Sequence, residues 1–588
     1  MPPLLDEVTN AIRARPRNSL AIEVPGEQQL SYDQLHQVIS SSREEIVRAQ
    51  LGRGDRVACI APRGPSGWIT FLIVSPICTC IPLTSALPIR SLISKCAMLR
   101  VAAVLAPQQF VSQHCSHFPD HIALLSLDLV SFEIAVVRPK SRFGQRDLEA
   151  CEDALLVETS GTTGEAKVVC LSPHNLLSTA MSIAQFFRLT PTDSCGSLVP
   201  FNHVHGLITT GLSTLLSGGR LVVFDSCRFT TAESLAGLRD TSWVSGTPSL
   251  YELILEAGRR HNCSLQGPRF IRVASASLPK DLRCRLEAAF GCRVIESYGL
   301  SETSSLIASQ DPNETAEVGS GVGRPVDAQL RIFEPTWNQS LSEQVGEIVV
   351  RGEGVCRGYL DGELPKTEDG WFRTGDIGFF DRKGSLFVLG RIKHQIRLGG
   401  ETIVPSVVEA ACSAIWGEAT AVAVGVPHAY WGEVPVVALL PRKVRGGHDT
   451  GEIDIDPGLF DVLAASNVPV GIICVAELPF TALGKIDRRR LEEQIEEHPV
   501  YRTWWADRTL PRTAAEAVLS ALLLQATDLT IGIHANYLLT DVSPTALRDW
   551  AAAIEMHFDR KGIARTMRRH YTIAKLAETL QRVGEGLQ

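Results

Sequence analysis

The feature that most constrains the fold is a regular alternation, from Leu30 to about Leu389, of short apolar runs with amphipathic stretches. The apolar runs include RVACIAP, AAVLAP, HIALLSL, GRLVVF, RFIRVAS and CRVIESYG, and helical patterns such as LPKDLRCRLEAAFG separate them. Strands of this kind are buried on both faces of parallel sheets, and the intervening helices cover those faces. The alternation therefore predicts an α/β fold with mostly parallel sheets.

A length of 588 residues allows two to four domains. The sequence pattern changes further along the chain, and these changes indicate the domain boundaries. Residues 346–390 read as antiparallel hairpins, with the turn Asp381–Gly384 between two apolar strands. A further α/β unit follows, and then a linker at 500–513 that carries a Trp pair. The predicted domains are a large multi-sheet N-terminal domain over residues 1–391, a small α+β domain over 392–499 and an all-α bundle over 510–588.

Composition narrows the classes of function. The formal net charge of -8, with 21% charged residues, argues against a surface that coats nucleic acid. The longest apolar run, Phe71–Leu83, is interrupted by Pro76 and is shorter than the roughly 20 residues of a membrane span. It reads as a buried strand and its approach, with Cys78 and Cys80 as small buried hydrophobic residues. The 15 cysteines lack zinc-site spacing. We expect no nucleic-acid partner, no membrane span and a reducing, cytoplasmic location.

The strongest local signal is the stretch VETSGTTGEAK at Val157–Lys167, which follows the apolar run ALLV. Its glycines let backbone N–H groups approach phosphate oxygens, its hydroxyl groups donate further hydrogen bonds, and Lys167 neutralises charge. It is not the GxxxxGK[ST] loop of common NTPases. Because a Ser/Thr/Gly cluster alone is more often a surface loop, this interpretation needs support from other motifs.

Four further motifs supply that support. TSGTTGEAK resembles the phosphate loop of the acyl-adenylate-forming superfamily, which includes acyl-CoA synthetases, peptide-synthetase adenylation domains and firefly luciferase. The later segments that resemble motifs of this family, in its order, are YGLSET at 298–303 (YGxTE), GWFRTGD at 370–376 (GWxxTGD), GRIK at 390–393 (the GRxK/D hinge) and PFTALGKIDR at 479–488 (PxTxxGKxxR). The resemblance implies the adenylate-forming fold, with a large N-terminal domain and a small C-terminal lid.

The resemblance also implies a site in which a carboxylate attacks the α-phosphate of ATP and pyrophosphate leaves. Lys485, Glu302 and His203 would be catalytic, with Glu302 holding Mg²⁺ and Lys485 contacting carboxylate and α-phosphate oxygens. Asp376, assisted by Arg391, would accept hydrogen bonds from the ribose. Tyr298 would stack near the adenine. The residues implied to bind ATP or AMP are Thr159, Ser160, Gly161, Thr162, Thr163, Gly164, Lys167, Ser275, Ala276, Ser277, Tyr298, Gly299, Ser301, Asp376 and Arg391.

A hinge is implied at Lys393, between the large and the small domain. Members of the family use one domain orientation for adenylation and rotate the small domain for the second half-reaction. The rotation would withdraw Lys485 and bring IRLGGET, residues 396–402, to the acyl-adenylate, where Gly399 and Gly400 leave room for pantetheine. Domain closure of this kind runs two reactions in one cleft.

The acid is indicated by PFNHVHG at Pro200–Gly206, which resembles the substrate-pocket motif of acyl- and aryl-CoA ligases, the oxalate-CoA ligase branch above all. His203 and His205 are thereby placed in the substrate and CoA channel. That branch carries a histidine shortly after the magnesium glutamate, where this chain reads ETSSL and Ser305 joins the channel. A neutral group replaces one that can be cationic, which puts oxalate itself in doubt. Peptide-synthetase domains usually have an Asp at the position of His203, which disfavours an α-amino acid.

The C-terminal stretch from LPRTAAEAV to YTIAKLAETL resembles the four-helix acyl or peptidyl carrier domain. Ser543 falls on the serine that receives phosphopantetheine, but both glycines, the preceding Asp and the following Leu of that motif are absent. Pro544 is tolerated at a first helical position. Two alternatives stay open: a degenerate, unmodified bundle in which Ser543 only caps a helix, which is favoured, and phosphopantetheine loading at Ser543.

The motifs together predict an ATP-dependent acid–thiol ligase. It would use ATP and Mg²⁺ to adenylate a small or medium carboxylic acid, and transfer the acyl group to CoA or to the thiol of a partner carrier protein. The alternatives are a peptide-synthetase-like adenylation protein of secondary metabolism that takes an amino or aryl acid, an amide-forming ligase, and a non-catalytic scaffold. The scaffold is disfavoured because a decayed enzyme has no physical need for the set Lys167, Glu302, Asp376, Arg391 and Lys485.

Overall fold

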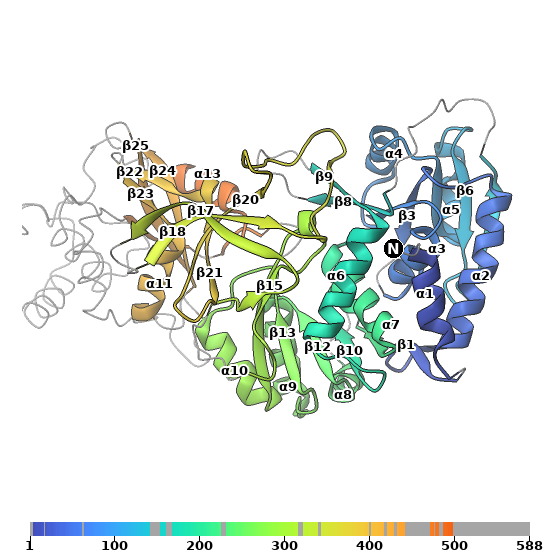
Figure 1. Ribbon diagram of the computed structural model, residues 1–588, viewed down its shortest axis with the longest axis horizontal. Helices are drawn as coiled ribbons and strands as arrows, with labels where there is room; N and C mark the ends of the chain where they lie inside the picture. Colours follow the sequence, from blue (N-terminus) through green and yellow to red (C-terminus); the bar gives the residue numbers. More distant parts are fainter. Residues whose placement is uncertain are drawn as a thin grey trace, which may run out of the picture. The chain divides into compact units, whose positions relative to one another are not determined.

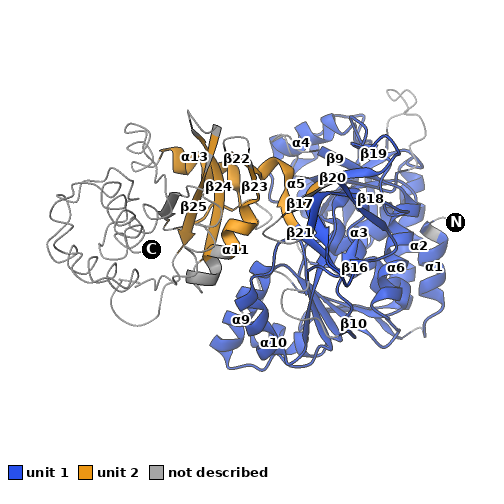
Figure 2. Cartoon of the chain, turned by 60° about the vertical axis from the view of Figure 1, so that its left-hand side comes forward, with its two compact units in different colours: residues 1–374, 378–388 blue, residues 375–377, 389–588 orange. Residues whose placement is uncertain are grey.

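A computed structural model describes most of the chain up to residue 497 (Figure 1). The described residues are 4–16, 18–61, 64–140, 153–159, 167–224, 231–314, 321–338, 343–398, 401–416, 420–428, 432–440, 471–475, 477–480 and 486–497. The chain divides into two compact units, which Figure 2 colours separately. Unit 1 consists of Met1–Thr374 and Gly378–Val388, and unit 2 of Gly375–Ile377 and Leu389–Gln588.

Within the described residues, unit 1 contains a sheet of nine strands that is parallel in its middle and antiparallel at its edges. Its strands, in spatial order, are β16 (Arg324–Pro325), β15 (Ala308–Ser309), β14 (Arg293–Tyr298), β13 (Phe270–Val273), β12 (Trp243–Gly246), β10 (Ser194–Ser197), β11 (Arg220–Val223), β1 (Leu20–Val24) and β2 (Gln28–Ser31). Helices α8 (Ala232–Arg239), α9 (Pro248–His261) and α10 (Lys280–Phe290) accompany this sheet (Figure 1).

The second large sheet of unit 1 has eight strands in the described residues and the same mixed character. Its strands, in spatial order, are β19 (Gly358–Tyr359), β9 (Lys167–Leu171), β8 (Leu155–Thr159), β4 (Thr79–Thr84), β3 (Arg56–Ala61), β5 (Ala103–Pro107), β6 (Ala123–Leu127) and β7 (Ile134–Arg138). The helices around it include α1 (Leu4–Arg13), α2 (Tyr32–Arg48), α3 (Ser66–Val74), α4 (Ile89–Met98), α5 (Gln108–His114) and the 3₁₀ turn η1 (Cys115–His117). The predicted α/β fold with mostly parallel sheets is confirmed.

Separate clusters of buried aliphatic and aromatic side chains form the core of unit 1 in the described residues, and the largest of them contains residues from both large sheets. The rings of Phe187, Trp243 and Phe270 lie within 5.5–5.9 Å of one another, an arrangement that adds to the stabilisation from burial alone. Cys78 and Cys80 are buried, as predicted. The run Phe71–Leu83 is buried too, but its first residues end α3 and only its second half forms β4. None of the helices in the described stretches could cross a membrane.

Two smaller sheets complete the described structure. One has the order β17 (Gln329–Asn338), β18 (Glu343–Arg351), β20 (Phe372–Phe380) and β21 (Leu386–Arg391). The other, in unit 2, has the order β23 (Glu401–Ile403), β22 (Ile396–Leu398), β25 (Gly432–Leu440) and β24 (Thr420–His428), with β26 (Gly471–Cys474) on β25 and with helices α11 (Pro405–Trp416) and α13 (Arg488–Glu497). Between β20 and β21 the backbone turns at Asp381–Gly384, which confirms that hairpin.

The hairpin expected within residues 346–360 is wrong. β18 pairs with β17, whereas β19 crosses to the eight-stranded sheet and pairs with β9. Helix α6 (Pro173–Phe186) helps to hold this crossing segment. Ser172 and Asn175 form a capping box at its start, and the Asn175 amide donates to the backbone oxygens of Glu353 (2.7 Å) and Val355 (3.1 Å). The strand pairing brings residue 359 beside residue 169, a neighbourhood that matters for the site below.

Candidate active site

The two ends of the predicted phosphate loop lie opposite each other in unit 1. β8 ends at Thr159, β9 begins at Lys167, and the antiparallel register pairs these two residues directly. The Thr159 hydroxyl donates to the backbone oxygen of Lys167 at 3.3 Å. Ser160, Gly161, Thr162, Thr163 and Gly164 lie outside the described residues. The hairpin therefore fixes the position and spacing of the two ends of the predicted loop.

A tyrosine connects the lysine of this hairpin to the predicted magnesium ligand. The ammonium of Lys167 lies 4.6 Å from the centre of the Tyr359 ring, within the range of a cation–π interaction. The Tyr359 hydroxyl donates to Oε1 of Glu302 at 3.0 Å. The backbone oxygen of Glu302 accepts a hydrogen bond from the backbone N–H of Cys356 at 2.8 Å. The structure thus gathers a cation, a phenol and a carboxylate from three separate parts of the sequence.

Glu302 lies on a tight turn that only a glycine permits. Tyr298 ends β14, Glu302 sits in the 3₁₀ turn η3 (Ser301–Thr303), and Gly299 lies between them. A Cβ atom on Gly299 would come within 1.4 Å of the backbone oxygen of Ser305. The close approach is possible because glycine has no side chain. It places Ser305 directly against the Tyr298–Glu302 segment.

Two consecutive serines leave this turn in left-handed backbone conformations. Ser304 has φ 55° and Ser305 has φ 109°, values that cost residues other than glycine free energy. Side-chain hydrogen bonds hold both in place: the Ser304 hydroxyl donates to the Gly354 oxygen at 2.8 Å, and the hydroxyls of Ser305 and Thr209 lie 2.6 Å apart. Ser305 is therefore fixed as a neutral, hydrogen-bonded group beside the Glu302 turn.

His205 begins the π-helix η2 (His205–Leu212), and Thr209 lies in the same helix. π-helices are rare and occur often at functional sites. Gly206 allows the chain to enter η2, because a Cβ atom there would lie 2.4 Å from the Pro200 oxygen. Nδ1 of His205 lies 3.3 Å from the Ser275 hydroxyl, and Nε2 lies 2.8 Å from the Ser245 hydroxyl. The predicted residues His205, Ser275 and Ser305 thus all border η2, and we call these three residues with Thr209 and Ser245 the η2 cluster.

An arginine lies behind the η2 cluster. Arg272 on β13 is 2% exposed, and its Nη1 lies 2.8 Å from Nε2 of His205. Burial lowers the pKa of the His205 imidazole well below its usual value, and the positive charge of Arg272 and the neighbouring His203 act in the same direction. His205 is therefore neutral at physiological pH. His203 is half-buried, whereas Ser275, Ala276 and Ser277 are exposed at the end of β13.

In unit 2, an ion pair joins the two predicted ribose ligands. Nε of Arg391 lies 2.6 Å from Oδ1 of Asp376, which is 4% exposed. Gly375, just before this aspartate, has φ 72°. Lys393 lies in the 3₁₀ turn η4 (Ile392–His394), where burial and the charge of Arg391 lower the pKa of its ammonium. The predicted hinge lysine therefore lies in a cation-rich segment that directly follows Arg391.

Several predicted site residues lie outside the described part of the chain. Besides the loop residues 160–164, they are Lys485, Gly399, Gly400 and Ser543. Their roles stay predictions. Four residues that contact the site were not predicted: Tyr359, Arg272, Thr209 and Ser245. For Tyr359 the signal was present in GVCRGYL, which was interpreted only as part of a hairpin.

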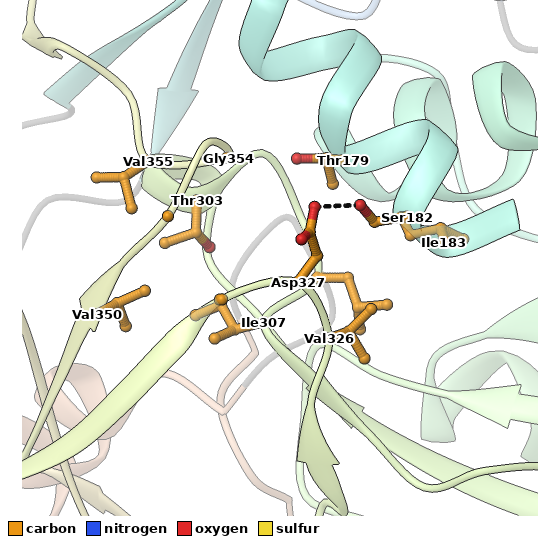
Figure 3. A pocket seen from close by; sticks show the side chains of 13 residues that line it. Thr179, Ser182, Ile183, Thr303, Ile307, Val326, Asp327, Val350, Gly354 and Val355 are labelled. Atoms are coloured by element: carbon orange, nitrogen blue, oxygen red, sulfur yellow. Dashed lines mark hydrogen bonds between the residues drawn. The ribbon is translucent and has the colours of Figure 1, made fainter. Parts of the chain in front are cut away.

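A separate small pocket, partly open to solvent, lies next to the Glu302 turn. It is bordered by α6, by the segments around Val326 and Val350, and by Thr303 of η3, and Figure 3 shows Asp327 turned toward Ser182, to which it is hydrogen-bonded. None of the predicted site residues lines it. The pocket is therefore a neighbour of the predicted site and not the site itself.

The residues fit a nucleotide with Mg²⁺. Mg²⁺ takes oxygen ligands and is usually held by one or two carboxylates together with substrate phosphates. Glu302 offers such a carboxylate, oriented by Tyr359 through one of its oxygens. When bound, the ion would neutralise charge on the phosphate oxygens. No group of three or more potential ligands for a metal ion occurs in the described segments.

Comparison with known proteins shows which family the chain resembles. A family model described as "AMP-binding enzyme" matches residues 8–360. The oxalate–CoA ligase of Arabidopsis thaliana is 32% identical over 498 residues, which covers 82% of this chain and 96% of that protein. The sulfoacetate–CoA ligase of Cupriavidus necator is 33% identical over 347 residues, 58% of this chain and 66% of that protein.

Among solved structures, ATP-bound MatB from Rhodopseudomonas palustris has a TM-score of 0.68 to this chain. The match is 24% identical in sequence and covers 84% of this chain and 99% of that one, so it shows a shared fold. The family match spans more than half of the chain, and the Arabidopsis relative matches nearly from end to end. The chain belongs to the family of AMP-binding enzymes.

Proposed function

We propose that the protein is an ATP-dependent acid–thiol ligase that forms the CoA thioester of a small carboxylic acid. A carboxylate oxygen attacks the α-phosphorus of ATP, the bond to the β-phosphate breaks, and pyrophosphate leaves with its electron pair. The CoA sulfur then attacks the acyl carbon of the acyl-AMP, and AMP leaves. Family membership supports this reaction, as do the CoA-ligase names of the relatives that cover most of the chain.

The observation that carries the proposal is the arrangement of Lys167, Tyr359 and Glu302 at the end of the β8–β9 hairpin. Lys167 supplies positive charge at the end of the loop that would hold the β- and γ-phosphates, and Glu302 supplies a hard oxygen ligand for Mg²⁺. Both charges contact the same phenol. Preorganised charges of this kind stabilise the charge that develops on phosphoryl oxygens in the transition state.

Other residues would bind the remaining parts of the substrates. Asp376, held by Arg391, is a buried carboxylate suited to accept hydrogen bonds from the ribose hydroxyls. Tyr298, at the end of β14, would stack near the adenine. Lys485 would contact the carboxylate and the α-phosphate during adenylation, and Gly399 and Gly400 would line the path of the pantetheine arm.

The η2 cluster supports a small acid that meets neutral hydrogen-bonding side chains at one end, with the cation of Arg272 behind them. His205 is neutral, and the hydroxyls of Thr209 and Ser305 satisfy each other at 2.6 Å. The position after the magnesium glutamate thus offers a hydroxyl where the oxalate-CoA ligase branch carries a histidine. We therefore favour a small acid other than oxalate, and an α-amino acid is disfavoured because His203 stands at the position of the usual aspartate.

CoA is the favoured acceptor, and the thiol of a partner carrier protein is the second. The alignment with the Arabidopsis oxalate–CoA ligase leaves 18% of this chain uncovered, enough for the carrier-like stretch predicted at 510–588. That Ser543 carries phosphopantetheine is the less favoured alternative. The reducing, cytoplasmic location also stays a prediction from the cysteine pattern.

A panel of carboxylic acids tests the proposal. Purified protein with Mg²⁺ and ATP should exchange labelled pyrophosphate into ATP with at least one acid, and Lys485→Ala should suppress that exchange. The same acid with CoA should give a thioester that mass spectrometry detects. The absence of exchange with every acid would refute the proposal. Incubation with CoA and a phosphopantetheinyl transferase separates the acceptors, since a mass increase at Ser543 would favour the carrier alternative.

A further inference from the structure

Arg272 is a buried cation whose hydrogen bonds reach no carboxylate among the residues that the structure describes. Within the described part of the chain they go to the Ser297 hydroxyl (Nε, 2.9 Å), the Ser245 hydroxyl (Nη1, 3.1 Å) and Nε2 of His205 (Nη1, 2.8 Å). Burial lowers the pKa of Arg272 to about 10, which leaves the guanidinium charged at neutral pH. Burying an ion is unfavourable unless it is well hydrogen-bonded, so this placement calls for an explanation beyond packing.

The guanidinium fixes the position of the hydrogen on His205. Arginine has only donors, so Nε2 of His205 must accept from it and cannot carry a hydrogen. The Ser245 hydroxyl accepts from the same Nη1 at 3.1 Å and lies 2.8 Å from Nε2, whose single lone pair accepts one hydrogen at a time. A neutral imidazole without a hydrogen on Nε2 carries it on Nδ1. Nδ1 therefore donates to the Ser275 hydroxyl at 3.3 Å.

The same logic sets the hydrogens on the other side of Arg272. The Ser297 oxygen accepts from Nε, so its hydrogen is available for Ser309, whose hydroxyl oxygen lies 2.9 Å away. The Ser309 hydroxyl in turn donates to the Gln310 backbone oxygen at 3.0 Å. A single guanidinium thus orients a chain of hydroxyls across β13, β14 and β15, which gives the network one hydrogen arrangement.

We propose that Arg272 is a positioning residue: by donating to Nε2 of His205 it holds the Nδ1–H tautomer, so that His205 donates to Ser275 and the Ser275 hydroxyl donates to an oxygen of the bound substrate. Ser275 is suited to that step because it is exposed and has φ 72°, which turns it out of the β13 strand direction. Its oxygen is occupied as an acceptor from His205, so its hydrogen is free to point elsewhere. The inference rests on the proposed function and on the predicted role of Ser275–Ser277 in binding the nucleotide.

Two pairs of matched variants test the relay. In His205→Asn the amide nitrogen takes the place of Nδ1 and can still donate to Ser275, whereas in His205→Gln the amide reaches the place of Nε2 and serves only Arg272. We expect His205→Asn to keep at least ten times more of the acid kcat/KM in pyrophosphate exchange than His205→Gln. Arg272→Met should lose roughly 10- to 100-fold of that kcat/KM, and Arg272→Lys, which still donates, should restore most of it.

A pH profile separates positioning from a purely structural role. Arg272 and His203 are the charged or titratable groups that act on His205 in the described residues, and both lower the pKa of its imidazole. Without the guanidinium that pKa rises, although burial, the largest cause of its lowering, remains. The profile of kcat/KM for Arg272→Met should therefore gain a fall on the acid side that the unmodified protein lacks, and His205→Asn in the same background should remove this fall.

A spectroscopic measurement tests the tautomer without any substrate. In the full-length protein labelled with ¹⁵N-histidine, the signal that His205→Gln removes should show hydrogen on Nδ1 and none on Nε2. Hydrogen on Nε2, or equal activity of His205→Asn and His205→Gln, would overturn the inference. Failure of the proposed function has a different signature, namely no exchange with any acid together with an unchanged Nδ1–H signal.

Discussion

Tyr359→Phe is the most informative single change at the site, because it removes one atom and leaves the ring. The hydroxyl donates to Oε1 of Glu302 at 3.0 Å, while the ring keeps Lys167 at 4.6 Å from its centre. A hydrogen bond to a charged group contributes about 1.5–3 kcal/mol, and the half-burial of both side chains favours the lower value. About 1.4 kcal/mol corresponds to a tenfold change in an equilibrium constant.

We therefore expect Tyr359→Phe to raise the Mg²⁺ concentration that gives half-maximal pyrophosphate exchange about tenfold. The KM for the acid should change less than twofold, since neither group is proposed to contact the acid. Tyr359→Leu also removes the ring, and a cation–π contact at a partly exposed site contributes about 0.5–1 kcal/mol. It should add a further two- to fivefold increase in the KM for ATP.

The assay is a Mg²⁺ titration of exchange at saturating acid, repeated at several ATP concentrations. Tyr32→Phe is a suitable control, because it removes a buried hydroxyl that donates to the Gly219 oxygen at 2.7 Å, in another part of unit 1. That control should lower the thermal stability and leave the Mg²⁺ requirement unchanged. If Tyr359→Phe needs no more Mg²⁺ than the unmodified protein, the assignment of Glu302 as the ion's ligand, oriented by Tyr359, is wrong.

Three further outcomes are expected. Asp376→Asn should raise the KM for ATP roughly tenfold or more, measured by exchange at fixed acid, because it removes the charge that Arg391 binds; an unchanged KM would contradict the ribose assignment. Gly299→Ala should lower stability by about 3 kcal/mol in urea unfolding, whereas Gly362→Ala, with no atom near its Cβ, should not; equal effects would refute the close approach. At pH 8 iodoacetamide should modify exposed Cys284 long before Cys356, since burial raises the pKa of the Cys356 thiol to about 12 and keeps it protonated. Mass spectrometry of peptides measures the order of modification, and modification of Cys356 first would contradict this expectation.

The large sheets could be predicted because their buried strands correspond to continuous apolar runs in the sequence. The run RVACIAP became β3, and GRLVVF contains β11. The same signal is ambiguous for helices: Phe71–Val74 looked like the approach to a strand and forms the end of α3. A fully apolar segment has no polar face, so its periodicity cannot separate a buried helix from a buried strand.

The site was predictable where the chemistry is local and not where it depends on distant strand pairing. Lys167 and Glu302 lie in motifs whose residue types point directly to phosphate and metal binding. Tyr359 reaches both of them only because β19 pairs with β9, a long-range pairing that the sequence of either strand does not encode. Arg272 was hidden for a different reason: an arginine in a strand normally marks the exposed face, and here serines and a histidine make its burial possible.

The left-handed serines Ser304 and Ser305 have a consequence for how the substrate selectivity of the enzyme could evolve. Their left-handed backbone is opposed by local preference and maintained by Thr209 on one side and Gly354 on the other. A segment whose shape depends on its neighbours can be moved by altering those neighbours. Replacements in η2 could thus reshape the surroundings of the acid while the carboxylate of Glu302 keeps its own support from Tyr359. Selectivity and metal binding, although only three residues apart in sequence, would then be free to evolve separately.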